Sequence, residues 1–232
     1  MNLTRIQKEL TGMLFPSACC GCGRALAIDA FTLCSGCEDH LPLTKYWNVR
    51  DNPVERLFWG KIFPERASSF LFFTRGGMVQ QMIHQLKYRG KTDVGTVLGQ
   101  KFGEHLNHTQ YAECDLILPV PLHRKRQQHR GYNQCDFIAS GLSLALNIPI
   151  ENHAVKRVRY TESQTRKGVY QRWINVKELF EVAEPERVAS RHVLLVDDVV
   201  TTGSTLEACA GALQSVPGTR VSIATIAIAA PV

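Results

Sequence analysis

Two adjacent carboxylates, Asp197 and Asp198, follow four apolar residues, 193–196, and precede a turn rich in threonine, glycine and serine. The apolar run predicts a buried parallel strand, and ligands bind outside the carboxyl ends of such strands in open α/β sheets. The turn leads into a predicted helix, where backbone N–H groups and hydroxyls can hold a phosphate. Two acids beside such a turn suit a ligand with a phosphate and vicinal hydroxyls, which they bind directly or through Mg²⁺. The alternative is an ordinary strand-to-helix turn with a capping Asp or Thr.

A strongly basic segment follows a second short apolar strand. Residues 119–134 hold four Arg or Lys side chains and no acid. Prolines end the strand and deliver the basic loop to the same edge of the sheet. Guanidinium forks and backbone donors of such a loop are the expected partners of pyrophosphate, which carries several negative charges. The alternative is a solvated basic loop, or a helix start that pairs with nearby acids.

Positive charge is concentrated in two stretches of the chain. Residues 156–172 hold six basic residues and one acid, and residues 119–134 carry the four described above. The summed charge of these two stretches exceeds the formal net charge of the chain, +6, so the rest of the chain is slightly acidic. This distribution indicates a polyanion site rather than a generally basic surface.

Five of the eight cysteines lie between positions 19 and 37. Two C-x₂-C pairs, Cys19 with Cys22 and Cys34 with Cys37, each enclose a glycine that lets both sulfurs face one ion. Four thiolates satisfy tetrahedral Zn²⁺ without an open position, which predicts a structural zinc site. Cys20 leaves the register of the first pair open, and buried free thiols without metal are the alternative.

The chain divides by pattern into three parts. Residues 1–45 combine a short helix with the four-cysteine zinc module, residues 46–66 form an irregular linker with several aromatics, and residues 67–232 form a regular domain. Strands are expected at 68–73, 115–120, 193–196, 221–228 and from 154, and helices at 78–88, 94–106, 132–146 and 204–213. Strands that alternate with helices predict an α/β fold, with a mostly parallel sheet flanked by helices.

The apolar runs are short. None reaches the roughly 18 residues that a membrane-spanning helix needs. The first residues form an amphipathic pattern rather than the unbroken apolar core of a signal peptide. We therefore expect a cytoplasmic protein without membrane insertion.

The acid pair and its turn resemble, over their whole length, the binding motif of type I phosphoribosyltransferases. The resemblance implies the type I phosphoribosyltransferase fold, with 5-phosphoribosyl-1-pyrophosphate (PRPP) and Mg²⁺ as ligands and with the acid pair facing the ribose hydroxyls. The residues implied to wrap the 5′-phosphate are Val199, Val200, Thr201, Thr202, Gly203, Ser204 and Thr205. The pyrophosphate loop would supply Pro121, Leu122, His123, Arg126, Arg130, Asn133 and Gln134. Catalysis would rest on the acid pair with Arg124.

The segment PVPLH…RGYNQ together with VDDVVTTGST resembles the ComF family, whose members include competence proteins needed for DNA uptake. These proteins also begin with a cysteine module, here a zinc-ribbon-like one, and carry a basic T-x-x-Q hairpin, which would be residues 157–164. The hairpin occupies the place of a hood that closes over the substrate in related transferases. The residues implied to complete the pyrophosphate site, or to contact a polyanion outside it, are Arg159, Gln164, Arg166 and Arg172. A solvated hairpin is the alternative.

Two functions stay open at this point. The first is an enzyme that transfers a phosphoribosyl group to an unknown acceptor, in a ComF-type role in DNA uptake or utilisation. The second is a non-enzymatic, PRPP-gated protein that binds single-stranded DNA. In both cases competence-machinery proteins are candidate partners, and pyrophosphate release or salt-sensitive DNA binding would separate the two.

Overall fold

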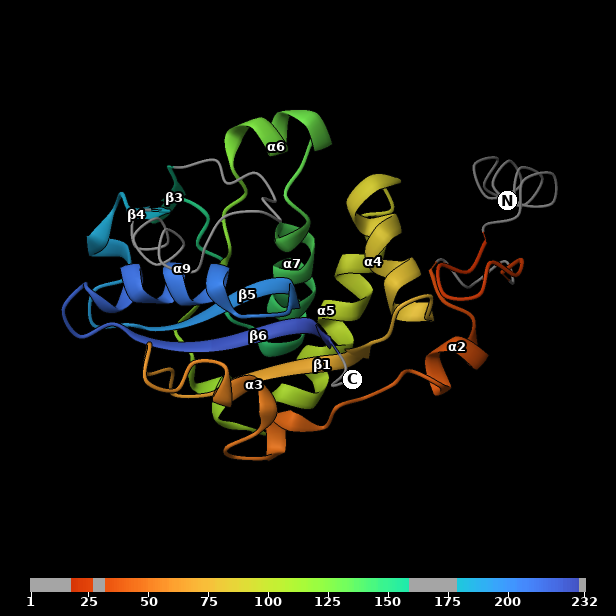
Figure 1. Cartoon of the computed structure of the whole chain (residues 1–232), viewed down its shortest axis with the longest axis horizontal. Helices are drawn as coiled ribbons and strands as arrows, with labels where there is room; N and C mark the ends of the chain where they lie inside the picture. The colour runs from red at the N-terminus through yellow and green to blue at the C-terminus, as the bar shows by residue number, and fades with distance from the viewer. Residues whose placement is uncertain (1–17, 27–31, 159–178, 230–232) are drawn as a thin grey trace, which may run out of the picture.

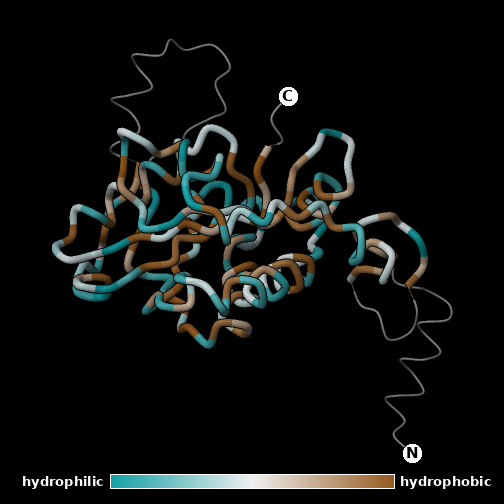
Figure 2. The backbone as a smooth tube through the Cα atoms, turned by 90° about the horizontal axis from the view of Figure 1, so that it is seen from below, coloured by the Kyte–Doolittle hydropathy of each residue, from teal (hydrophilic) through white to brown (hydrophobic). Residues whose placement is uncertain are grey.

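The computed structural model describes residues 18–26, 32–158 and 179–229. A four-stranded parallel sheet lies at its centre, with the strand order β1–β6–β5–β2. The strands are β1 (Ala67–Phe73), β2 (Leu116–Pro119), β5 (His192–Val200) and β6 (Arg220–Ala229). They are buried along nearly their whole length, as continuous apolar runs in a covered parallel sheet should be. Figure 2 shows the apolar stretches running through the middle of the molecule, where these strands lie.

Helices cover both faces of the sheet (Figure 1). One face carries α4 (Met78–Tyr88), α5 (Asp93–Leu106) and α7 (Gln134–Leu146), and the other carries α9 (Ser204–Gln214) and the short α3 (Pro53–Arg56). Helices α5 and α7 approach each other closely at two glycines. A Cβ on Gly99 would lie 2.2 Å from the carbonyl oxygen of Ile138, and one on Gly141 would lie 2.0 Å from that of Thr96. The expected parallel sheet with helices on both faces is confirmed.

The smaller elements join these layers. They are α2 (Ser35–Asp39), α6 (Arg124–Arg130), the antiparallel pair β3 (Val155–Arg157) and β4 (Phe180–Val182), and the 3₁₀ turns η1 (Tyr46–Asn48), η2 (Gln110–Glu113) and η3 (Pro185–Arg187). The expectation of a basic loop over 119–134 is wrong in part, because residues 124–130 form α6. None of its seven residues is buried, so the helix has no apolar stripe by which the sequence could have shown it.

The acid pair lies inside β5 rather than beyond its end. The sequence predicted that this strand stops at Val196, but Val199 and Val200 still pair with Ala227 and Ile228 of β6. The two valines are therefore strand residues, and the following turn begins at Thr201.

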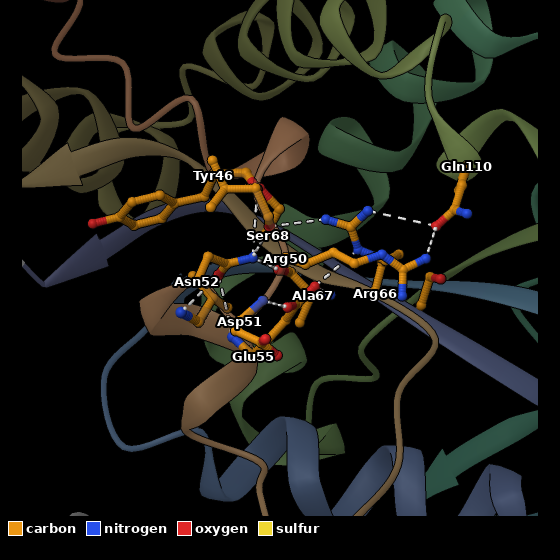
Figure 3. A network of polar contacts seen from close by, with 12 residues as sticks. Tyr46, Arg50, Asp51, Asn52, Glu55, Arg66, Ala67, Ser68 and Gln110 are labelled. Carbon is orange, nitrogen blue, oxygen red and sulfur yellow. Dashed lines mark hydrogen bonds and ion pairs between the residues drawn. The ribbon is translucent and has the colours of Figure 1, made fainter.

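Residues 46–66 pack directly on β1. Asn52 is the centre of this contact (Figure 3): its side chain accepts from the N–H groups that begin α3 and donates to the carbonyl oxygens of Ala67 and Val49, at 2.9 and 3.0 Å. Arg66 adds an ion pair with Glu55, in which Nε lies 2.9 Å from Oε1. The position of the domain boundaries at 45 and 66 stays a prediction.

The cysteine segment contacts helix α4. The side-chain amide of Gln85 donates to the carbonyl oxygen of Cys20 at 2.9 Å. A Cβ on Gly21 would lie 2.9 Å from both the sulfur of Cys37 and the sulfur of Met78. Among the described residues, no helix is long and apolar enough to cross a membrane.

Candidate functional site

The acid pair is held by contacts from two helices. Asp198 is buried, with 4% of its surface exposed. Lys87, the second-last residue of α4, places its Nζ 2.9 Å from Oδ1 and 2.8 Å from Oδ2 of Asp198. Asp197 accepts through Oδ1 from the Asp198 N–H at 2.8 Å and from the Cys135 thiol, at the start of α7, at 3.3 Å.

The electrostatics of this pair leave room for more positive charge. Burial, followed by the charge of Asp198, raises the pKa of Asp197 to about 6. Burial alone would lower the pKa of Lys87, but the adjacent Asp198 outweighs it and the pKa is raised. Because one ammonium faces two carboxylates, oxygen ligands remain that suit a hard divalent cation such as Mg²⁺.

The turn after β5 presents uncapped backbone donors. Gly203 precedes α9 with φ of +78°, and no side chain caps the first N–H groups of that helix. A Cβ on Gly203 would lie 2.9 Å from Cε1 of the buried Phe58. The hydroxyls of Thr202 and Ser204 are exposed and 3.0 Å apart. The helix start thus offers N–H groups and hydroxyls together, which is the arrangement that binds a phosphate.

A pocket of about 610 Å³ lies between the end of α4 and α6; in Figure 1, α6 is at the top and α4 lies below it and to its right. We call it the basic pocket. It is lined by Lys87, Tyr88, Gly90, Lys125, Arg126, His129, Arg130 and Tyr132, with no carboxylate among them. The guanidinium of Arg130 lies 5.3 Å from the ring centre of Tyr88. Partial burial and the charges of nearby Arg157, Lys125 and Arg126 lower the pKa of His123, just outside the pocket. The neighbouring cations therefore create a positive potential at His123.

The sequence-predicted site residues lie in different environments in the structure. Arg126 and Arg130 line the basic pocket, whereas Arg124 is exposed at the first position of α6 and does not line it. Pro121, Leu122 and His123 are half-buried between β2 and α6, and Val199 and Val200 pack into the two cores on either side of the sheet.

Asn133 and Gln134 are buried, and their amides bond to other groups of the protein. Asn133 caps α7 by accepting from the Cys135 N–H at 3.2 Å and donates to the Val120 carbonyl oxygen at 3.1 Å. Gln134 accepts from Arg130. Arg159, Gln164, Arg166 and Arg172 lie outside the described residues, and the roles of all these residues toward a ligand stay predictions.

The functional residue that the sequence did not reveal is Lys87. A lysine in the last turn of an amphipathic helix is usual, because it complements the helix dipole. Nothing in the local pattern ties it to Asp198, which is 111 positions further along the chain.

Four sulfur atoms meet in the cysteine cluster, which we define as Cys19, Cys22, Cys34 and Cys37. Their Sγ atoms all lie within 4.8 Å of one another, and those of Cys22 and Cys34 are 3.8 Å apart. Tetrahedral zinc with Zn–S bonds of about 2.3 Å places its sulfurs about 3.8 Å apart. Cys20 is buried outside the cluster, so the geometry selects the register that leaves it out.

Backbone and side-chain donors reach two of these sulfurs, those of Cys19 and Cys22, whereas burial raises the pKa of Cys37. The N–H groups of Gly21 and Cys34 donate to the Cys19 sulfur at 3.4 and 3.3 Å. Arg24 donates through Nε to the Cys22 sulfur at 3.4 Å and lowers the pKa of Cys22 to about 6. Donors of this kind favour thiolates, the form in which cysteine binds a metal.

Four matches with known proteins differ in extent. The family model described as the phosphoribosyl transferase domain matches residues 136–231. Competence protein F of Haemophilus influenzae is 46% identical over 93 residues, which are 40% of this chain and 41% of that protein. DNA utilization protein YhgH of Escherichia coli K12 is 31% identical over 197 residues, 81% of this chain and 80% of that protein. Among solved structures, the glutamine phosphoribosylpyrophosphate amidotransferase of B. subtilis aligns with 61% of this chain and 30% of its own, with 19% identity and a TM-score of 0.42.

The family model and the match with YhgH agree with the architecture described above. The likeness to YhgH runs through most of both proteins, and the matched domain contains β5, the acid pair and β6. The fold is the type I phosphoribosyltransferase fold, and the four-cysteine cluster near the N-terminus fits a small zinc module. The chain therefore belongs to the ComF family of phosphoribosyltransferase-fold proteins.

Proposed function

We propose that the protein binds PRPP together with Mg²⁺ and transfers its phosphoribosyl group to an acceptor during the uptake or use of DNA. One observation carries the proposal. Lys87 joins the acid pair to the basic pocket, because it contacts Asp198 and lines the pocket, and the uncapped start of α9 follows the acid pair by a few residues in the chain. A ligand with ribose hydroxyls, a 5′-phosphate and a pyrophosphate needs these three environments side by side. The names of the relatives support the link to DNA.

The residues of the chain would act mainly by positioning the substrate. The N–H groups and hydroxyls at 201–205 would hold the 5′-phosphate, and the acid pair would hold the ribose hydroxyls. The bond from the anomeric carbon to pyrophosphate breaks with its electron pair leaving on oxygen, and the acceptor forms the new bond and loses a proton. Cations of the basic pocket would stabilise the charge that develops on the leaving pyrophosphate. Mg²⁺, when bound, would supply further charge neutralisation.

The cysteine cluster would bind one structural zinc. A segment this small buries little apolar surface, so a metal is the expected source of its stability. We place the protein in the cytoplasm, where thiolates stay reduced and available to zinc.

Pyrophosphate release tests whether the site turns over. Purified protein would be incubated with PRPP, Mg²⁺ and candidate acceptors (nucleobases, amines and oligonucleotides), and pyrophosphate measured with a coupled enzyme. The proposal expects release above the rate of spontaneous hydrolysis with at least one acceptor, and loss of that release in Asp197→Asn. Release at the spontaneous rate with every acceptor would remove the transfer step and leave ligand binding to be tested separately.

The second candidate function is PRPP-gated binding of single-stranded DNA without turnover. The concentration of basic residues in 119–134 and 156–172 favours it, because phosphates of a single strand can follow such a surface. Anisotropy of a labelled oligonucleotide should then rise at low salt and fall steeply as salt increases. Neutral replacements at Arg159, Arg166 and Arg172 should flatten the salt dependence. No change in anisotropy at low salt and micromolar protein would exclude this function.

A further inference from the structure

Lys87 stands between two sites that each need a cation. Its ammonium contacts both oxygens of the buried Asp198, and the same side chain lines the basic pocket. The side chain is 23% exposed, so it is reached from the pocket while its partner, 5% exposed, is not. An anion in the pocket would therefore lie on the open side of this ammonium.

The end of helix α4 is held in place from several sides. The Tyr132 hydroxyl donates to the Leu86 carbonyl oxygen, and Gln85 donates to the carbonyl oxygen of Cys20. Arg130 covers the ring of Tyr88 on the pocket side. With its helix fixed, Lys87 can change partner only by rotating its own flexible side chain, which a lysine does more readily than an arginine.

Asp198 and Lys87 compensate each other, and neither can lose its partner without replacement. A buried carboxylate is costly when unpaired, and so is a mostly buried ammonium. If ribose hydroxyls or a divalent cation take the oxygens of Asp198, Lys87 needs a new negative partner. The basic pocket is the adjoining space, and none of the described residues that line it is a carboxylate, so a phosphate group of the ligand can supply that partner.

We propose that Lys87 contacts the ligand. In the free protein its ammonium neutralises Asp198, and when the ligand binds the side chain rotates so that the ammonium pairs with the pyrophosphate group, which occupies the basic pocket between α4 and α6. This rests on the proposed function in one respect, because it assumes that the anion in the pocket belongs to the molecule bound by the acid pair. It moves the catalytic cation from Arg124, which does not line the pocket, to Lys87.

The test titrates inorganic pyrophosphate and, separately, Mg²⁺ into wild type and Lys87→Met by calorimetry. Lys87→Met should bind pyrophosphate at least about tenfold more weakly, the loss expected for one charge-assisted hydrogen bond. It should bind Mg²⁺ at least as tightly as wild type, because Asp198 has lost its competing cation. Lys101→Met, which removes a lysine that pairs with Glu38 away from the pocket, is the control and should match wild type for both probes.

A weaker affinity for pyrophosphate without a weaker affinity for Mg²⁺ is the result that a merely structural ion pair would not give. Equal pyrophosphate affinity in wild type and Lys87→Met, or a parallel loss of both affinities, would overturn the proposal. Should Lys87→Met fail to fold, the pyrophosphate affinity of Lys87→Met/Asp198→Asn is compared with that of Asp198→Asn. This comparison measures the effect of the lysine on pyrophosphate binding without leaving a buried carboxylate unpaired. If PRPP binds equally to wild type and Lys87→Met, only this inference is refuted. If pyrophosphate binding depends on Lys87 but PRPP does not bind, only the proposed function is refuted.

Discussion

Replacing Gly203 by alanine should destabilise the protein, because two separate constraints require a glycine there. Its φ of +78° costs a residue with a Cβ about 1 kcal/mol or slightly more. The added Cβ would also lie 2.9 Å from Cε1 of Phe58, which is fully buried and cannot move without disturbing its neighbours. Overpacking of this kind costs about 1–3 kcal/mol. We expect a total loss of about 2–4 kcal/mol in the free energy of unfolding.

Gly60 provides a matched control. It has φ of +72°, and no atom lies within 4 Å of an added Cβ. Gly60→Ala should therefore lose only the backbone part, about 1 kcal/mol, and the difference between the variants measures the contact with Phe58. Urea denaturation of both variants and wild type gives these values. Because relief of the contact moves the start of α9, Gly203→Ala should also weaken PRPP binding, and Gly60→Ala should not. Equal destabilisation by the two substitutions would refute the claim that Phe58 confines this helix start.

Two further predictions concern the metal and the pH dependence. Elemental analysis of purified protein should show about one zinc per chain. The zinc should be lost in Cys34→Ser and kept in Cys20→Ala. A full equivalent of zinc in Cys34→Ser would contradict the assignment of Cys34 as a zinc ligand. The affinity for PRPP with Mg²⁺ should fall as the pH drops through about 6, where the pKa of Asp197 lies, and calorimetry on Asp197→Asn should not show this step. Because that pKa is raised above its ordinary 3.8, the folded state binds the proton more tightly. The contribution of this carboxyl to stability is therefore present at low pH and is lost as the pH rises from about 4 to 6, which denaturation of wild type and Asp197→Asn can test.

The strands and helices of the sheet layers were largely predictable from the sequence. Helix α4 has the bounds that its apolar spacing predicts, and the apolar run before the acid pair marks β5 as a buried strand. The end of β5 was misplaced because its last residues are held by pairing with β6, and such a tertiary contact leaves no local mark. Helix α6 was missed for a related reason, since a helix without a buried side has no periodicity to detect.

The candidate site was predictable where one short segment carries its chemistry. The types and order of Asp197, Asp198 and the turn after them predict a ligand site, and the cysteine spacing predicts the four-cysteine cluster. The role of Lys87 was not predictable, because it depends on the contact between α4 and Asp198 of β5 and not on the residues near Lys87 in the sequence. The contact of the Asn133 amide with the Val120 carbonyl oxygen was hidden in the same way, since the fold brings the two groups together.

A titration of PRPP in the presence of Mg²⁺ tests the central claim most directly. Wild type would be compared with Asp197→Asn/Asp198→Asn, and with Asp115→Asn as the control. Asp115 lies just before β2, and its carboxylate accepts from the N–H of His192, the first residue of β5. It therefore lies at the amino ends of these strands, whereas the acid pair lies toward the carboxyl end of β5. We expect saturable binding to wild type and Asp115→Asn, and at least about tenfold weaker binding to the double variant. Equal affinity in all three proteins would contradict it.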